Sequence, residues 1–182
     1  HYCSRRQRQM CIRDRYIGLE PHNWVTAWVA ITDSNEHNGC MRMWSGSHKD
    51  NLKKHNQMFN EGNLLTRGQT VNNVPIKKTT PLILDAGQMS LHHPTVVHGS
   101  DLNKSNDRRI GFVIQSYIGT NVKQVLGKNG VQLARGKDNY NFHETIERPK
   151  SLMDKNDIKI KKKENDNLQE IFYKGSSKKG NY

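Results

Sequence analysis

The sequence predicts a fold dominated by β-structure, either an antiparallel sandwich or a jelly roll. Short runs rich in β-branched and aromatic residues recur between residues 24 and 118, and clusters of turn-forming residues separate them. No convincing helical pattern falls between these runs, which argues against a βαβ fold. With 182 residues the chain is long enough to bury one hydrophobic core, and a second full domain is not expected.

The first fifteen residues, HYCSRRQRQMCIRDR, differ abruptly in composition from those that follow. They show neither helical nor strand periodicity, so they predict a disordered basic arm. The string SRRQRQMCIRDR also resembles a translated sequencing-adapter artefact, which makes residues 1–15 candidates for a non-native sequence. We therefore expect the native protein to begin at about Tyr16 and its core to span residues 16–148.

Four segments of this core are predicted to contain strands. WVTAWVAIT at 24–32 has the length and composition of a strand buried on both faces, and MRMW at 41–44 follows after the turn-rich string DSNEHNGC. Residues 49–80 are polar and predict an irregular excursion. PLILDAGQMSLHHPTVVHG at 81–99 predicts strand, turn and strand, and RRIGFVIQSYI at 108–118 is the longest strand candidate.

The positive charge of the chain is concentrated at its ends. The net charge is +12, of which residues 1–15 contribute five Arg and one Asp and residues 149–182 contribute nine Lys and five acids, +4 in each case. No basic helix, RNA-binding aromatic motif or zinc finger accompanies this charge, so no nucleic-acid partner is expected. The lysine- and asparagine-rich residues 149–182 predict a disordered tail, in which only NLQEIF could form one or two helical turns.

Cysteine content and hydropathy narrow the class of protein further. The three cysteines form no CxxC pair, so neither a disulfide framework nor a cysteine zinc site is expected. No run of 18 or more apolar residues is present, and no apolar stretch follows the first arginines, so neither a membrane span nor a signal peptide is predicted. These features predict a cytoplasmic protein without a membrane partner.

Three histidines in the string SLHHPTVVHGS are candidate metal ligands, namely His92, His93 and His98. Neutral imidazole is a common ligand of transition metals, and non-haem iron(II) oxygenases use two histidines and one carboxylate on one face of the ion. His92 and His93 are adjacent, so on a strand they would point to opposite faces. A structural or surface role remains open for each of the three.

The string HGSDLNKSNDRRIGFVIQSYI, which begins at His98, resembles the distal half of the phytanoyl-CoA dioxygenase family signature. The resemblance implies that His98 binds iron and that Arg109, eleven residues later, binds the carboxylate of 2-oxoglutarate, with the Ser100 hydroxyl on the same carboxylate. It thereby implies iron(II), 2-oxoglutarate and O2 as cofactors and cosubstrates. The alternatives are two exposed arginines beside a turn and an ordinary turn serine.

Strand periodicity separates the two adjacent arginines. If Arg109 points inward, then Gly111, Val113 and Gln115 share its face, while Arg108 points away. An arginine fork pairs bidentately with a carboxylate, so the inward residue is the one suited to the cosubstrate.

A second block, PHNWVTAWVAITDSNEHNGCMRMWSGSHK at 21–49, resembles the central stretch of the same family, with serine in place of the usual proline before Gly46. The resemblance implies that Thr26 and Trp28 line the cosubstrate pocket, although a buried tryptophan is also a common core residue. It places His48 in a turn, so His48 is not expected to bind metal.

The family resemblance implies a double-stranded β-helix, that is, a cupin-like jelly roll, with residues 24–32 and 108–118 both in inner strands. The family also has a proximal H-x-D motif, which supplies one histidine and the carboxylate of the iron site. That motif should lie at positions 11 and 13, where this chain has Cys11 and Arg13. Asp14 cannot replace it, since Ile12 stands two residues before it.

The sequence therefore predicts a 2-oxoglutarate-dependent dioxygenase that hydroxylates a small organic substrate, present here as a fragment without H-x-D. As written, the chain is expected to show little or no activity. The alternatives are a non-catalytic jelly-roll protein that binds a small molecule and, third, a basic nucleic-acid-binding protein. The identity of the substrate and the oligomeric state stay open.

Overall fold

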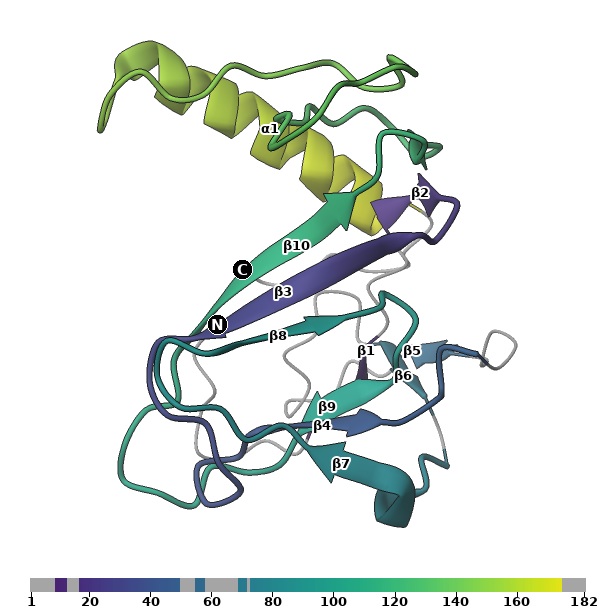
Figure 1. Ribbon diagram of the computed structural model, residues 1–182, viewed down its shortest axis with the longest axis vertical. Helices are drawn as coiled ribbons and strands as arrows, with labels where there is room; N and C mark the ends of the chain where they lie inside the picture. The colour runs from purple at the N-terminus through teal and green to yellow at the C-terminus, as the bar shows by residue number, and fades with distance from the viewer. Residues whose placement is uncertain (1–8, 13–16, 50–54, 58–68, 72, 175–182) are drawn as a thin grey trace. The chain divides into compact units, whose positions relative to one another are not determined.

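The computed structural model describes most of the chain (Figure 1). The described residues are 9–12, 17–49, 55–57, 69–71 and 73–174. They form two compact units, of which the first contains β1 and Trp24–Tyr117 and the second contains residues 17–23 and 118–174.

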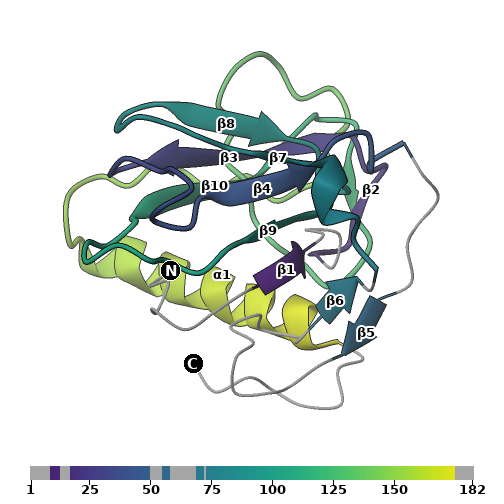
Figure 2. The same cartoon turned by 90° about the horizontal axis from the view of Figure 1, so that it is seen from below.

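Two antiparallel sheets form most of the first unit (Figures 1 and 2). The four-stranded sheet has the order β1 (Gln9–Ile12), β9 (His98–Ser100), β4 (Met41–Trp44) and β7 (Thr79–Pro81). The three-stranded sheet has the order β10 (Gly111–Ile118), β3 (Trp24–Ala30) and β8 (Met89–His92). The expected predominance of β-structure is confirmed.

The two sheets face each other across a hydrophobic cluster. Trp28 and Ala30 of β3 and Met41 of β4 are its buried members. Partly buried Met43, Leu82, Leu84 and Val113 pack against them. Because these side chains come from both sheets, the alternation of buried positions along β3 defines the face that looks toward the opposite sheet.

Shorter elements complete the two units. In the first unit β5 (His55–Gln57) pairs with β6 (Gln69–Val71), and the short 3-10 helix η2 (Ile76–Lys78) precedes β7. In the second unit β2 (Leu19–Glu20) pairs with β11 (Lys123–Gln124). Much of the irregular excursion expected at residues 49–80 lies outside the described residues.

The strand expected at 108–118 is confirmed only from Gly111 onward, since residues 108–110 have no strand geometry. Among the described strands β3 has a neighbour on each side, whereas β10 is at the edge of its sheet, so the expectation that both are inner strands is wrong for β10. The predicted alternation also fails at Gln115, which is exposed. The next residue, Ser116, has a φ of 66°, which breaks the two-residue repeat of the strand.

The expectation of a disordered arm is wrong for residues 9–12. They form β1, which pairs with β9 in the register Gln9 to Ser100, Met10 to Gly99 and Ile12 to His98, with an irregularity between Met10 and Ile12. Main-chain hydrogen bonds to the edge of β9 stabilise this strand without any alternation of apolar side chains. The rest of the expected arm lies outside the described residues.

The expectation of a mostly disordered C-terminal tail is also wrong, because α1 spans Lys155–Tyr173. The Asp154 side chain caps this helix by accepting hydrogen bonds from the main-chain N–H groups of Asn156 and Asp157. Glu164 accepts a 2.6 Å hydrogen bond from the N–H of Gly130, and Ile171 is buried against Gly127. These contacts within the second unit supply the stabilisation that the polar composition does not reveal.

In the part of the chain that the structure describes, no helix has both the length and the apolar character that crossing a membrane requires.

Candidate functional site

A turn built around Asn103 leads from β9 to Arg109. The buried Asn103 side chain donates a 2.8 Å hydrogen bond to the carbonyl of Asp107. Its amide oxygen accepts hydrogen bonds from both the N–H and the hydroxyl of Ser105, at 2.9 and 2.7 Å. Asn103 and Ser105, which lie in the string that resembles the family signature, therefore have a structural role, since they hold the turn that returns the chain to the start of β10.

Arg109 is partly buried, whereas the neighbouring Arg108 is exposed, as the strand pattern predicts. The Nη2 of Arg109 donates a 3.2 Å hydrogen bond to the Oγ of Ser100, and its Cζ lies 5.5 Å from the ring centroid of Trp28. The Nε of Arg109 is buried and has no hydrogen-bond partner among the described residues. The structure thus brings together three of the residues that the sequence singled out.

Trp28 and Thr26 lie on the face of β3 that looks toward the opposite sheet, and both are buried. A Cβ atom at Gly111 would overlap the indole ring of Trp28. The absence of a side chain at Gly111 therefore allows the indole to approach β10 closely, next to the Arg109 guanidinium.

His98 begins β9 and is only 8% exposed. Its Nδ1 lies 3.0 Å from the carbonyl oxygen of Val96, a geometry in which Nδ1–H donates to that carbonyl. This hydrogen bond orients the ring and leaves the lone pair of Nε2 as the metal-binding atom, which is the usual arrangement at histidine metal ligands.

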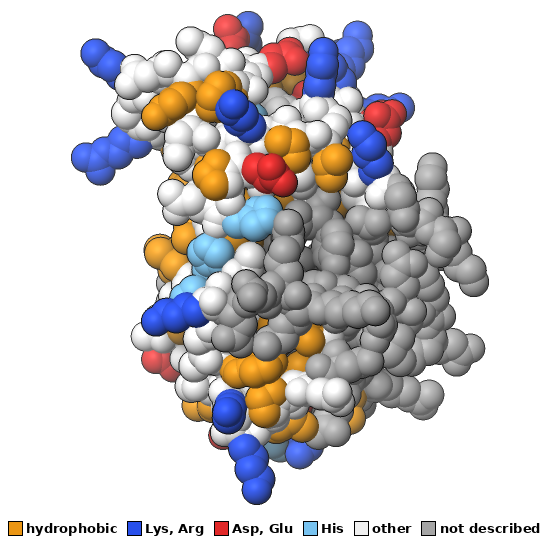
Figure 3. All heavy atoms as spheres, turned by 90° about the vertical axis from the view of Figure 1, so that its right-hand side faces the viewer, with side chains coloured by type: hydrophobic (Ala, Val, Ile, Leu, Met, Phe, Trp, Pro, Cys, Tyr) orange, Lys and Arg blue, Asp and Glu red, His pale blue; other side chains and the backbone are white. Residues whose placement is uncertain are grey.

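The two histidines before His98 have different neighbours. His92 ends β8 opposite Thr26, and its ring centroid lies 5.1 Å from that of His98. The Nδ1 of His93 lies 2.8 Å from the Oγ1 of Thr95, and its ring is 5.6 Å from that of His48. Histidine side chains gather on the face drawn in Figure 3.

The described residues do not form a complete iron site. None of their His, Cys, Asp and Glu side chains come together in a group of three or more that could hold a metal ion. The main chain of β1, which contains position 11, pairs directly with β9, which contains His98. At the positions where the family resemblance implies H-x-D, the sequence has Cys11 and Arg13.

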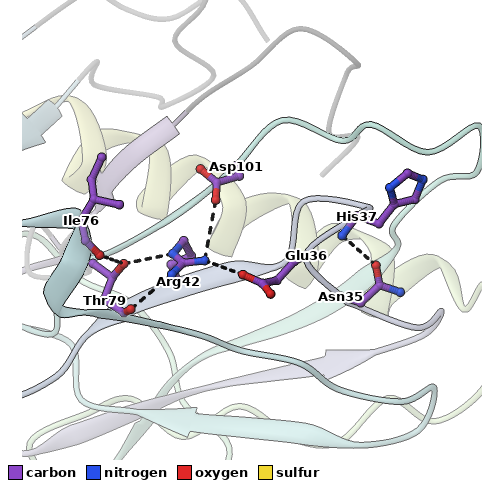
Figure 4. A network of polar contacts seen from close by, with 7 residues as sticks. All are labelled: Asn35, Glu36, His37, Arg42, Ile76, Thr79 and Asp101. Carbon is purple, nitrogen blue, oxygen red and sulfur yellow. Dashed lines mark hydrogen bonds and ion pairs between the residues drawn. The ribbon is translucent and has the colours of Figure 1, made fainter.

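Sequence reasoning missed a charged network around Arg42 on β4 (Figure 4). Arg42 Nε donates to Thr79 Oγ1 at 3.0 Å, and its Nη1 forms an ion pair with Glu36 at 2.9 Å. The same nitrogen lies 4.0 Å from a carboxylate oxygen of Asp101. Arg42 thereby links β4 to β7 and to Asp101, the residue after β9. The sequence signal that could have pointed to this role is the position of Arg42 in the string NGCMR, within the block that resembles the family.

The buried Cys40 lies next to this network. Burial raises the pKa of the Cys40 thiol, and the nearby negative charge of Glu36 raises it further, while Arg109 and Arg42 act in the opposite direction. Because the thiol stays protonated at neutral pH, Cys40 behaves as a small core residue rather than a nucleophile.

The chain matches the model of a known protein family. The family model described as Phytanoyl-CoA dioxygenase (PhyH) matches residues 9–111, which is more than half of the 182 residues. The chain belongs to the phytanoyl-CoA dioxygenase family. The match includes β1, His98, Ser100 and Arg109.

Curated relatives include peroxisomal phytanoyl-CoA dioxygenases. The mouse protein is 27% identical over 117 residues, which are 63% of this chain and 34% of the relative. The human protein is 30% identical over 96 residues, which are 52% of this chain and 28% of the relative. This member of the phytanoyl-CoA dioxygenase family thus spans about a third or less of the length of these relatives.

Solved structures with a similar fold include two non-identical enzymes. The apo form of the non-heme monooxygenase ThoJ is 27% identical, covers 92% of this chain and 61% of its own, and superimposes with a TM-score of 0.80. The epimerase SnoN, solved with Fe3+, alpha ketoglutarate and nogalamycin RO, is 18% identical, covers 64% and 44% of the two chains, and has a TM-score of 0.51. The second likeness concerns the fold alone.

Proposed function

We propose that this chain is the cosubstrate-binding core of an iron(II)- and 2-oxoglutarate-dependent dioxygenase that hydroxylates a small organic substrate. In this reaction class 2-oxoglutarate is oxidised to succinate and CO2, while one atom of O2 enters a C–H bond and the other enters succinate. Membership of the phytanoyl-CoA dioxygenase family supports the reaction class. The same membership supports iron(II) and 2-oxoglutarate, which the family resemblance implies as metal and cosubstrate.

We infer that the two facing sheets are those of a double-stranded β-helix. Along the chain, β1, β4, β7 and β9 belong to one sheet and β3, β8 and β10 to the other. The chain therefore passes repeatedly from one sheet to the opposite one, which is the course of a jelly roll rather than of two successive meanders.

The observation that carries the proposal is the incompletely bonded guanidinium of Arg109. Its Nη2 donates to Ser100, and its Nε is buried without a partner in the part of the chain that the structure describes. A buried donor left unpaired is costly, so such a group commonly has a ligand as its partner. Nε and Nη2 lie on one edge of the guanidinium, which is the edge that pairs bidentately with a carboxylate.

The other pocket residues suit the same ligand. The Ser100 hydroxyl is within reach of whatever binds this edge of Arg109, and the Trp28 indole forms the adjoining wall. Thr26 lies on the same face of β3 as Trp28. We assign 2-oxoglutarate to Arg109, Ser100, Trp28 and Thr26, with its far end directed toward His98.

A specific observation also favours a non-catalytic role for the chain as written. The family's iron site needs two histidines and one carboxylate, and the positions expected for H-x-D hold Cys11 and Arg13. His98 supplies one of these three ligands, and one ligand cannot hold the iron ion as the complete set would. The second candidate function is therefore a jelly-roll protein that binds 2-oxoglutarate or a related dicarboxylate without oxidising it.

The two adjacent arginines offer a matched test of the cosubstrate assignment. Isothermal titration with 2-oxoglutarate, without metal, would compare Arg109→Gln with Arg108→Gln. Loss of a charge-assisted hydrogen bond costs roughly 1.5 to 3 kcal/mol, so we expect Arg109→Gln to weaken binding about ten-fold to a hundred-fold. Arg108→Gln should leave the affinity unchanged, and equal effects from both variants would remove the assignment.

A further inference from the structure

The inner face of the three-stranded sheet carries a polar group that the family motifs do not assign. In the pairing of β3 with β8, Thr26 lies opposite His92 and Trp28 lies opposite Ser90. Directly paired residues of antiparallel strands point to the same face. His92 therefore shares the inner face with Trp28, whereas Leu91 is 62% exposed on the outer face.

His92 meets His98 across the space between the two sheets. His92 ends β8 in the three-stranded sheet, and His98 begins β9 in the four-stranded sheet. Their ring centroids are 5.1 Å apart and their planes are inclined by 58°. Both residues are at strand ends inside one unit, so their separation is set by the sheets rather than by a loop.

This separation agrees with two imidazoles on one metal ion. A ring nitrogen bound at roughly 2.0 to 2.1 Å places the ring centroid about 3.2 Å from the ion, so two such rings at 90 to 110° are separated by roughly 4.5 to 5.2 Å. The observed 5.1 Å falls in this range. The hydrogen bond from His98 Nδ1 to Val96 leaves Nε2 as the atom available to such an ion.

We propose that His92 and His98 form a two-imidazole site for a divalent late transition metal, with Cu2+ as its strongest binder. The inference rests on the proposed function only through His98, the residue that the family resemblance assigns to the metal. Imidazole suits Cu, Ni and Zn, and Cu2+ stands highest in the general order of affinity. Water, or a carboxylate of the cosubstrate, would complete the coordination.

The chain contains its own control for this proposal. His48 and His93 also approach each other, at 5.6 Å. However, His48 is exposed in a turn, and the Nδ1 of His93 lies 2.8 Å from the Thr95 hydroxyl. This second pair is less constrained, so it should bind a metal ion more weakly than His92 and His98.

The test uses Cu2+ at one equivalent with the full chain and no 2-oxoglutarate. Competition with a chromophoric chelator gives the affinity, and the nitrogen hyperfine splitting in the electron paramagnetic resonance spectrum gives the number of bound imidazoles. The variants are His92→Phe, His98→Phe, His93→Phe and His48→Phe, which keep a ring at each position. His92→Gln is a second variant at the proposed position, and circular dichroism confirms the fold of each.

We expect His92→Phe, His92→Gln and His98→Phe each to weaken the tight site at least ten-fold and to lower the nitrogen count from two to one. His93→Phe and His48→Phe should change neither quantity. The proposal is overturned if both His92 variants keep the affinity and nitrogen count of the parent, or if the control pair carries the tight site. Failure of 2-oxoglutarate to bind without metal would contradict the proposed function and leave the copper result to be judged separately.

Discussion

Gly111 shows how one small residue can shape the proposed cosubstrate pocket. Its position at the start of β10 allows the Trp28 indole to lie against the strand, because any Cβ there would overlap the ring. The indole in turn flanks the guanidinium of Arg109. The proposed cosubstrate pocket therefore depends on the size of residue 111, which has no side chain of its own to contact a ligand.

Gly111→Ala should displace the Trp28 indole and weaken 2-oxoglutarate binding. Overpacking of this kind costs roughly 1 to 3 kcal/mol, and we expect the loss to show both in stability and in cosubstrate affinity. Tryptophan fluorescence and isothermal titration would measure the two effects. Phe112→Ala is the matched control, since Phe112 is 59% exposed on the neighbouring position, and a similar loss of affinity in this variant would argue against the role of Gly111.

The buried thiol of Cys40 predicts a dependence of stability on alkaline pH. Folding raises the pKa of this thiol above its unfolded value of about 8.5. The protonated thiol therefore contributes its full share of the free energy of unfolding below the unfolded pKa. That contribution is lost as the pH rises through the higher folded pKa. Urea unfolding between neutral pH and mildly alkaline pH should show this loss, and Cys40→Ala should reduce it.

The same burial predicts slow alkylation of Cys40 at neutral pH. Peptide mapping after brief iodoacetamide treatment should find Cys40 unmodified in the folded chain and modified in urea. Rapid modification of this residue in the folded chain would show that the thiol is accessible.

At the scale of elements, α1 and β1 show which information the sequence lacks. The α1 sequence is rich in Lys, Asn and Asp, so its composition resembles that of a disordered segment. Its helical state depends on the Asp154 cap and on contacts of Glu164 and Ile171 with residues far away in the chain. No local pattern shows such contacts, and the same holds for the pairing of β1 with β9.

Two isoleucines of α1 test whether tertiary packing holds the helix. Ile171 is 1% exposed and Ile158 is 46% exposed, so the same substitution samples both environments. Ile171→Ala should lower the stability of the helix by about 2 to 5 kcal/mol, whereas Ile158→Ala should change it by about 0.5 kcal/mol or less. Hydrogen exchange of the α1 amides would measure both, and equal protection in the two variants would contradict the packing argument.

At the scale of the whole molecule, strong local patterns predicted the elements that position the site. The apolar run of β3 and the motif from His98 to Arg109 predicted the strands and the inward direction of one arginine. The alternation of buried and exposed residues in β10 fails beyond Val113, near the positive φ of Ser116. A serine in the sequence gives no sign of such a backbone conformation, so this failure could not be predicted. The ring contact between His92 and His98 could not be predicted either, since it depends on the spacing of two sheets.

The proposed cosubstrate pocket is accompanied by an incomplete iron site among the described residues. Arg109, Ser100 and Trp28 are in contact, while the described residues offer no group of three metal ligands. Binding and turnover should therefore separate: the chain should bind 2-oxoglutarate yet fail to oxidise it. Restoration of the H-x-D residues should give a chain that both binds and oxidises 2-oxoglutarate.

Succinate formation from 2-oxoglutarate in air, with iron(II) and ascorbate, tests this claim most directly. We expect no succinate above the protein-free rate from the chain as written. Of the family's three metal ligands it has His98 at its motif position, but not the histidine and the carboxylate of H-x-D. The double variant Cys11→His and Arg13→Asp should produce succinate, and adding Arg109→Gln to it should abolish that production. Sustained succinate formation by the unaltered chain would contradict the account.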